Sequence, residues 1–226
     1  MEEHLAQECA DVHRAIETAA GGHVAEGSVG AGTGMITCDF KAGIGTASRR
    51  IPTDGATYTV GVLVNTNWGK MLDLRVDGVA VGELLAAEYA NVVKRQRNAG
   101  SIIVVLATDA PLWPVQMARV CKRAALGIGR AGSCAAHASG EIIVGFSTAN
   151  RVPRKTKRMT HRMVALLDER ITPLYEATVE ATEEAIVNAL CMAQPMYGVN
   201  DHFVPALPLD KLSQLLRRYR PPRPLD

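Results

Sequence analysis

The dipeptide Gly100-Ser101 stands directly before the apolar run 102–107, a position in which the serine could act as a nucleophile. Its hydroxyl group could attack the carbonyl group of Gly100, because glycine tolerates the strained backbone angles that such an attack requires. The peptide bond would become an ester, and water would then release a new chain that begins with Ser101. The freed α-amino group has a pKa of about 7.7 to 8.0, so near neutral pH it can accept the proton of its own hydroxyl group. This is the chemistry of an N-terminal-nucleophile hydrolase, whereas the same dipeptide before a strand is more commonly a simple turn.

Ser139 and Glu141 form a second pair that could take part in this chemistry. They are two residues apart at the start of an expected strand, so in extended backbone both side chains leave on one face. Since an unpaired buried charge is very costly, Glu141 lies either at a solvated sheet rim, the more common case, or buried with a partner. In the catalytic interpretation Glu141 stabilises the new ammonium group and Ser139 bridges it to Ser101.

Asn67 is a candidate for stabilising the oxyanion that forms when a carbonyl group is attacked. It lies in the segment 65–69, directly after an expected strand. A side-chain amide at a strand end can donate to the oxyanion, and loss of one such donor typically costs about 10² to 10³ in rate. An asparagine-rich strand end is also a common turn, so both interpretations stay open.

The dipeptide Gly132-Ser133 is a weaker alternative to Gly100-Ser101. It follows an expected helix and enters a loop, where no sheet would anchor the serine.

Two groups of strands are expected to position these residues. The β-branched runs 102–107 and 141–146 show no alternation, which predicts strands buried on both faces. Shorter β-like runs predict an antiparallel sheet in the first half of the chain, and Asp77-Gly78 predicts a hairpin turn within the last of them. These runs cover 35–40, 44–51, 58–64 and 74–81.

Helical spacing and composition indicate helices over 5–16, 83–97, 112–129, 172–193 and 209–219. The first carries an apolar stripe that ends in Val12 and Ile16 and is expected to pack on another element. The fourth is expected to have Thr172 as its N-cap and Pro173 at its first helical position. Strands combined with one-sided helices predict an α+β layered sandwich in a single domain, 1–226.

The composition is that of a folded globular chain rather than a disordered one. The 226 residues include 25 Lys and Arg against 23 Asp and Glu, and this balance gives no sign of nucleic-acid or membrane binding. The basic run from Arg151 to Arg162 lacks interleaved aromatic residues, so a solvated loop or subunit rim explains it better than a nucleic-acid interface. No apolar run approaches the roughly 18 residues that a membrane span needs.

Cysteine and histidine usage points to no metal centre and no disulfide framework. The five cysteines are widely spaced without a CxxC motif, and the six histidines include no pair at metal-ligand spacing. The chain begins without the basic and apolar segments of a secretory signal. We therefore expect a cytoplasmic protein with no cofactor and with neither nucleic acid nor membrane as a partner.

Several blocks of the sequence, in order along the chain, resemble the L-aminopeptidase/D-Ala-esterase and β-aminopeptidase family, the DmpA-type N-terminal-nucleophile peptidases. The blocks are 27–35, 43–49, 58–69, 100–111, 139–150 and 204–208.

The resemblance implies an αββα layered sandwich that is cleaved at Gly100-Ser101 into an α chain, 1–100, and a β chain, 101–226. It implies an enzyme that releases N-terminal amino acids from peptides, amides or esters and that assembles as a homotetramer. By position, Ser101 matches the nucleophile, Ser139 and Glu141 the assisting serine and acid, and Asn67 the oxyanion-hole asparagine.

Members of this family carry a long segment before the first helix, which the resemblance places outside this sequence together with a tyrosine that helps to stabilise the transition state. We therefore expect an N-terminally truncated relative whose missing wall could come from a partner chain. The alternative is a catalytically inactive homologue that serves as a structural or binding subunit.

Overall fold

The computed structural model describes residues 2–53, 55–94 and 99–220. Within these residues the α-helices are α1 (Glu2–Glu17), α2 (Val81–Leu85), α3 (Pro114–Arg130), α4 (Thr172–Cys191) and α5 (Leu209–Tyr219). The strands are β1 (Ile36–Thr37), β2 (Phe40–Lys41), β3 (Ile44–Thr53), β4 (Ala56–Asn67), β5 (Ala99–Thr108), β6 (Ala138–Ser147), β7 (Met196–Tyr197) and β8 (Phe203–Val204). Short 3-10 helices are η1 (Gly30–Gly32), η2 (Met71–Asp73), η3 (Asp168–Arg170) and η4 (Val199–Asp201).

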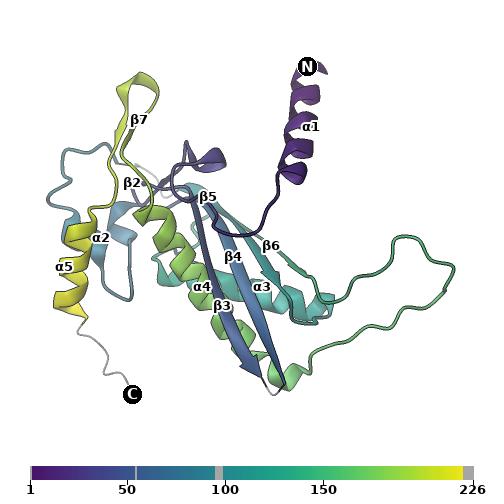
Figure 1. The fold of residues 1–226 in the computed structure, drawn as a ribbon. Helices are drawn as coiled ribbons and strands as arrows, with labels where there is room; N and C mark the ends of the chain where they lie inside the picture. The colour runs from purple at the N-terminus through teal and green to yellow at the C-terminus, as the bar shows by residue number, and fades with distance from the viewer. Residues whose placement is uncertain (1, 54, 95–98, 221–226) are drawn as a thin grey trace.

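The main sheet has the strand order β3-β4-β5-β6. The first three strands pair in antiparallel fashion, and β5 and β6, which α3 connects, pair in parallel. Figure 1 shows α3 and α4 along one face of this sheet, where they also pack against each other. The described residues thus place the helix layer of α3 and α4 on this four-stranded sheet, beside the two-stranded sheets β1-β2 and β7-β8, which confirms the predicted combination of helices and strands.

The covered face of the sheet holds the core. Alternate residues of β4 and β5, among them Val64 and Val104, are fully buried beneath the helices. The helix α4 approaches closely because its inner stripe is made of alanines such as Ala185 and Ala189, and because β3 offers Gly45 beneath it. Small residues on both sides bring the two backbones into contact.

The opposite face of the sheet is open. Ile103, Ile142, Val144 and Phe146 all point to this side and are about half exposed. The prediction that β5 and β6 are buried on both faces is therefore wrong within the part of the chain that the structure describes. The apolar run was read correctly as strand, but no described helix or strand covers its second face.

The region before the Gly100-Ser101 junction also differs from expectation. The predicted helix 83–97 shortens to α2, which ends at Leu85 and is followed by turns up to residue 92, while 95–97 lie outside the described residues. The predicted strand 74–81 is only an isolated bridge between Val76 and Val79 around the expected Asp77-Gly78 turn. Both segments have suitable composition, but α2 packs on η2 and the Tyr89 ring packs on Phe40 of β2 instead of extending a helix or a sheet.

Most helix predictions are confirmed. The ends of α3, α4 and α5 lie within two residues of those expected. Thr172 is not the N-cap of α4, because Ile171 takes that position without a side-chain cap. Val12 and Ile16 of α1 are exposed, and Figure 1 shows α1 standing apart from the sheet, so the expected packing of its stripe is not seen. The side chains of Leu5 and Cys9 lie outside the described residues.

The basic run follows β6 as part of a long loop that extends from the body of the protein (Figure 1). Every residue from 151 to 162 is exposed, as the solvated-loop interpretation predicted. None of the described helices is both long and apolar enough to cross a membrane.

Substitution of Gly45 tests whether the contact between β3 and α4 holds the sheet and helix layers together. A Cβ atom there would lie 1.9 Å from the backbone oxygen of Ala185. We expect Gly45→Ala to lower the free energy of unfolding by about 1–3 kcal/mol, as overpacked cores do, measured by urea denaturation.

Gly61→Ala is the matched control, because a Cβ atom at Gly61 of β4 would meet only the oxygen of Ala107, at 3.9 Å. This variant should be unchanged or gain up to about 1 kcal/mol from the reduced backbone entropy of the unfolded chain. Equal effects at the two glycines would contradict the proposed role of the Gly45 contact.

Candidate active site

The Gly100-Ser101 junction lies at the head of β5. The Gly100 φ is +125°, a conformation that residues with side chains rarely adopt. Ser101 Oγ donates a hydrogen bond to the carbonyl oxygen of Gly100 at 2.7 Å and accepts one from the backbone N–H of Gly140 at 3.3 Å. The hydroxyl group therefore lies against the carbonyl group of the one peptide bond that it would have to attack.

Asn67 lies directly opposite Ser101. The antiparallel register of β4 and β5 pairs these two residues, and paired residues place their side chains on the same face, with Cβ atoms about 4.5–5.5 Å apart. Asn67 Oδ1 accepts a hydrogen bond from the backbone N–H of Ile36 at 3.3 Å. The amide thus turns its oxygen toward Ile36 and its nitrogen away from it. The structure brings the predicted oxyanion donor beside the predicted nucleophile.

Ser139 and Glu141 lie on the next strand, β6. The parallel register pairs Gly100 with Ser139 and Ile102 with Glu141. Ser139 Oγ donates to Glu141 Oε1 at 2.7 Å, so the prediction that both side chains share a face is confirmed.

That face is the one that carries the helices, whereas the Ser101 side chain leaves on the open face. The two faces differ because Gly140, between Ser139 and Glu141, is the residue paired with Ser101. Among the described contacts, Ser101 Oγ is hydrogen-bonded to the backbone of Gly100 and Gly140 and not to Ser139. A bridge from Ser139 to Ser101 stays a prediction.

Glu141 borders a cleft between β6 and α3, lined also by Met117, Cys121 and Lys122. Burial raises the pKa of the Cys121 thiol, which keeps it neutral near pH 7. Glu141 is partly exposed and has a hydrogen-bond partner, so it combines features of the rim and the paired interpretations.

The alternative dipeptide Gly132-Ser133 lies in the loop after α3, as expected. Ser133 Oγ accepts a hydrogen bond from the backbone N–H of Ala135, a local loop contact. No strand carries this serine, so the structure places only Ser101 at the head of the sheet.

Sequence reasoning missed Lys41. This lysine lies in β2 with its side chain only 2% exposed, and burial lowers its pKa. Its Nζ donates to the carbonyl oxygens of Gly32, Met35 and Ala42. A lysine between buried apolar residues in a strand is the signal that could have revealed it.

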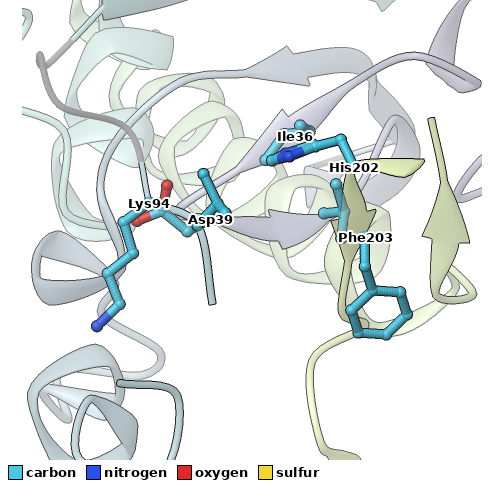
Figure 2. Close-up of a pocket in the computed structure, with 7 residues that line it drawn as sticks. Ile36, Asp39, Lys94, His202 and Phe203 are labelled. Carbon is cyan, nitrogen blue, oxygen red and sulfur yellow. The ribbon is translucent and has the colours of Figure 1, made fainter. Parts of the chain in front are cut away.

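A small cavity of about 180 Å³ adjoins the site on the side of the β1-β2 hairpin. Figure 2 shows Ile36, Asp39, Lys94, His202 and Phe203 at its wall, with the Lys94 ammonium pointing away from Asp39. Ile36 belongs both to this wall and, through its N–H, to the contact that orients the Asn67 amide. Ile36 therefore lies between the cavity and Asn67, the candidate oxyanion donor.

Comparison with known proteins shows a consistent set of relatives. The model of peptidase family S58 matches residues 3–204. The chain is 45% identical over 218 residues to the beta-peptidyl aminopeptidase BapA of Sphingosinicella microcystinivorans, covering 92% of this chain and 55% of that protein.

Two solved structures share the fold. The PH0078 protein of Pyrococcus horikoshii OT3 is 46% identical, with a TM-score of 0.79 over 88% of this chain and 54% of its own. The L-aminopeptidase D-Ala-esterase/amidase of Ochrobactrum anthropi, described as a variant of the Ntn hydrolase fold, is 40% identical, with a TM-score of 0.83 over 93% of this chain and 57% of its own. The chain spans about half the length of the relatives it matches.

Proposed function

The chain belongs to peptidase family S58, and from this we propose that it is the nucleophile-bearing part of an autoprocessing serine aminopeptidase or amidase. One observation carries the proposal: Ser101 Oγ lies 2.7 Å from the carbonyl oxygen of Gly100, with Asn67 paired opposite. The inactive-subunit alternative is not favoured, because the four candidate residues within this sequence lie on adjacent strands at one end of the sheet. They are Asn67, Ser101, Ser139 and Glu141.

Autoprocessing would proceed through the contacts at the head of β5. Ser101 Oγ attacks the carbonyl carbon of Gly100, the C–N bond breaks, and the hydroxyl proton passes to the departing nitrogen of Ser101. Water then hydrolyses the ester, leaving a carboxylate on Gly100 and a free α-amino group on Ser101. The positive φ of Gly100 and the hydrogen bond from Gly140 both support this attack, since they hold the carbonyl and hydroxyl groups together.

Turnover would use the same serine with its new amine. The amine takes the hydroxyl proton as Oγ attacks the substrate carbonyl, the Asn67 amide donates to the oxyanion, and the proton passes on to the leaving group. Water then releases the acyl group from Ser101.

Ser139 and Glu141 can serve this amine from the other face of the sheet. A main-chain nitrogen lies in the plane of the sheet, so it is not confined to the face of its own side chain. A freed ammonium on Ser101 is therefore one residue along the strand from Gly100, the residue that pairs with Ser139. Glu141, hydrogen-bonded to Ser139, supplies the negative charge that stabilises it.

The substrate class follows from the family. We propose that substrates carry a free N-terminal amino acid joined to a peptide, amide or ester. The names of the relatives include both beta-peptidyl and L-aminopeptidases, which supports the general class without selecting one kind of residue.

The open sheet face supports a further part of the proposal, assembly of the chain as a homo-oligomer. Its apolar residues Ile103, Ile142, Val144 and Phe146 adjoin the row that holds Ser101. Monomeric proteins rarely leave such a patch in water. A second copy that covers this face would also close the site on its open side.

Intact-mass measurement tests autoprocessing. We expect the wild-type chain to yield fragments of 100 and 126 residues, the second beginning with Ser101, and Ser101→Ala to stay whole. Ser133→Ala is the matched control, because it removes the hydroxyl of the other Gly-Ser dipeptide and should cleave normally. A wild-type chain that stays intact after prolonged incubation would rule out autoprocessing of this chain.

Hydrolysis of aminoacyl p-nitroanilides tests turnover. We expect the cleaved protein to release p-nitroaniline and Ser101→Ala to release none. Asn67→Ala, which removes one oxyanion donor, should lower kcat by about 10² to 10³. Cleaved protein without this activity would separate processing from turnover and count against the aminopeptidase proposal for this chain alone.

Light scattering tests the assembly. The proposed homo-oligomer should exceed the 24.2 kDa of one chain, and Val144→Lys should reduce its mass by charging the open face. Leu126→Lys is the control, since Leu126 lies on α3 and is 58% exposed against 54% for Val144. A wild-type monomer would contradict this part of the proposal.

A further inference from the structure

The ammonium group of Lys41 is fully used inside the protein. Nζ donates to Met35 O at 2.7 Å, Ala42 O at 2.8 Å and Gly32 O at 3.2 Å, so three N–H donors meet three carbonyl acceptors. Burying a charge is costly, and a methionine of similar length would fill the space without that cost. The presence of a lysine therefore calls for a role beyond packing.

The peptide group between Met35 and Ile36 connects this lysine to the candidate site. Its carbonyl oxygen accepts from Lys41 Nζ at 2.7 Å and, at the longer distance of 3.4 Å, from the backbone N–H of Ala42, and its N–H donates to Asn67 Oδ1 at 3.3 Å. A trans peptide is planar, so its C=O and N–H bonds point in opposite directions and cannot turn independently. Holding the oxygen toward Lys41 therefore aims the N–H at Asn67. A cation on the oxygen also polarises the N–H and strengthens its donation.

The direction of the Asn67 amide decides what this side chain can do. With Oδ1 held by Ile36, the nitrogen is turned away from Ile36. An amide rotated by half a turn would exchange the positions of acceptor and donor, and an acceptor would repel an oxyanion instead of stabilising it.

We propose that Lys41 is a positioning residue for the oxyanion site, acting on Asn67 through the Met35–Ile36 peptide. The inference rests on the proposed function for the role of Asn67 and goes beyond it by assigning a group that helps to orient the amide. Lys41 itself touches neither Ser101 nor the substrate.

Other contacts hold the β1-β2 hairpin without the ammonium group. The side chains of Thr37 and Thr66 are hydrogen-bonded in the core, and the backbone N–H of Lys41 donates to Pro205 O at 2.7 Å. A variant that loses only the Lys41 ammonium should therefore retain the hairpin, which makes the proposal testable by substitution.

A double-mutant cycle on the rate of chain cleavage tests the proposal, because attack on the Gly100 carbonyl also forms an oxyanion to which the Asn67 amide would donate. We expect Lys41→Met to slow cleavage about 10-fold or more and Asn67→Ala about 10²-fold, within the range for loss of an oxyanion donor. Because Lys41 acts through Asn67, the double variant should be no slower than Asn67→Ala alone. Lys157→Met, the same change on the exposed loop, should cleave at the wild-type rate. Independent, multiplying effects of the two substitutions would overturn the proposal.

A second measurement does not depend on activity. In the uncleaved Ser101→Ala chain, Lys41→Met should speed hydrogen exchange of the Ile36 amide about 10-fold or more and shift the NMR signals of the Asn67 side-chain amide, without altering exchange in β4 and β5. Unchanged Ile36 exchange and Asn67 signals would overturn the inference. If the wild-type chain is never cleaved, the proposed function fails while this measurement still decides the role of Lys41.

Lys41→Arg, which keeps the charge and the donors, should recover part of the Ile36 protection. If neither Lys41→Met nor Lys41→Arg folds, the hydrogen bond from Lys41 to Met35 can be measured in the Ser101→Ala chain, which keeps Lys41. A scalar coupling across the hydrogen bond should join Lys41 Nζ to the carbonyl carbon of Met35, and its absence, with rapidly exchanging ammonium protons, would contradict the proposal.

Discussion

The backbone hydrogen bonds that pair β4 with β5 and β5 with β6 set one row of residues across the end of the sheet, Asn67, Ser101 and Gly140. All the chemistry proposed for this protein depends on that row. A slip of one residue would turn the Ser101 side chain to the helix face and separate it from Asn67. The register is held by the alternation of β5, whose Ile102, Val104 and Leu106 are buried beneath the helices and resist such a slip.

The two faces of the sheet have different tasks. One face is covered by α3 and α4, and the absence of a side chain at Gly45 allows α4 to pack closely against β3. This packing holds the strands in place. The other face is open and carries Ser101 at one end of an apolar surface. The nucleophile proposed at Ser101 therefore has no covering element on this side among the described residues. The packing that stabilises the sheet and the substrate binding proposed above thus belong to opposite faces of one layer.

The polar groups at the head of the sheet are ordered by backbone atoms more than by side chains. Gly140 N–H holds Ser101, Ile36 N–H holds Asn67, and three carbonyl groups hold Lys41. Backbone dipoles are fixed once the strands and the glycine loop have folded, so they can preorganise a site without further loss of entropy. This explains why the site is found where a parallel strand pair, an antiparallel pair and a tight hairpin meet.

The sequence alone determined the strands β3 to β6, most of the helices, the family and the identity of the candidate residues, because strand composition, helical spacing and short motifs are local properties. It also predicted that Ser139 and Glu141 share a face, which strand alternation dictates. It could not show that this face lies opposite that of Ser101, because the pairing of Gly140 with Ser101 is a long-range register. The predicted helix at 83–97 was too long. The prediction that β5 and β6 are buried on both faces was wrong, since apolar content does not reveal whether a covering element is present. The role proposed for Lys41 rests on tertiary structure alone, because its three acceptors and the peptide that links it to Asn67 meet only when the hairpin folds against β4.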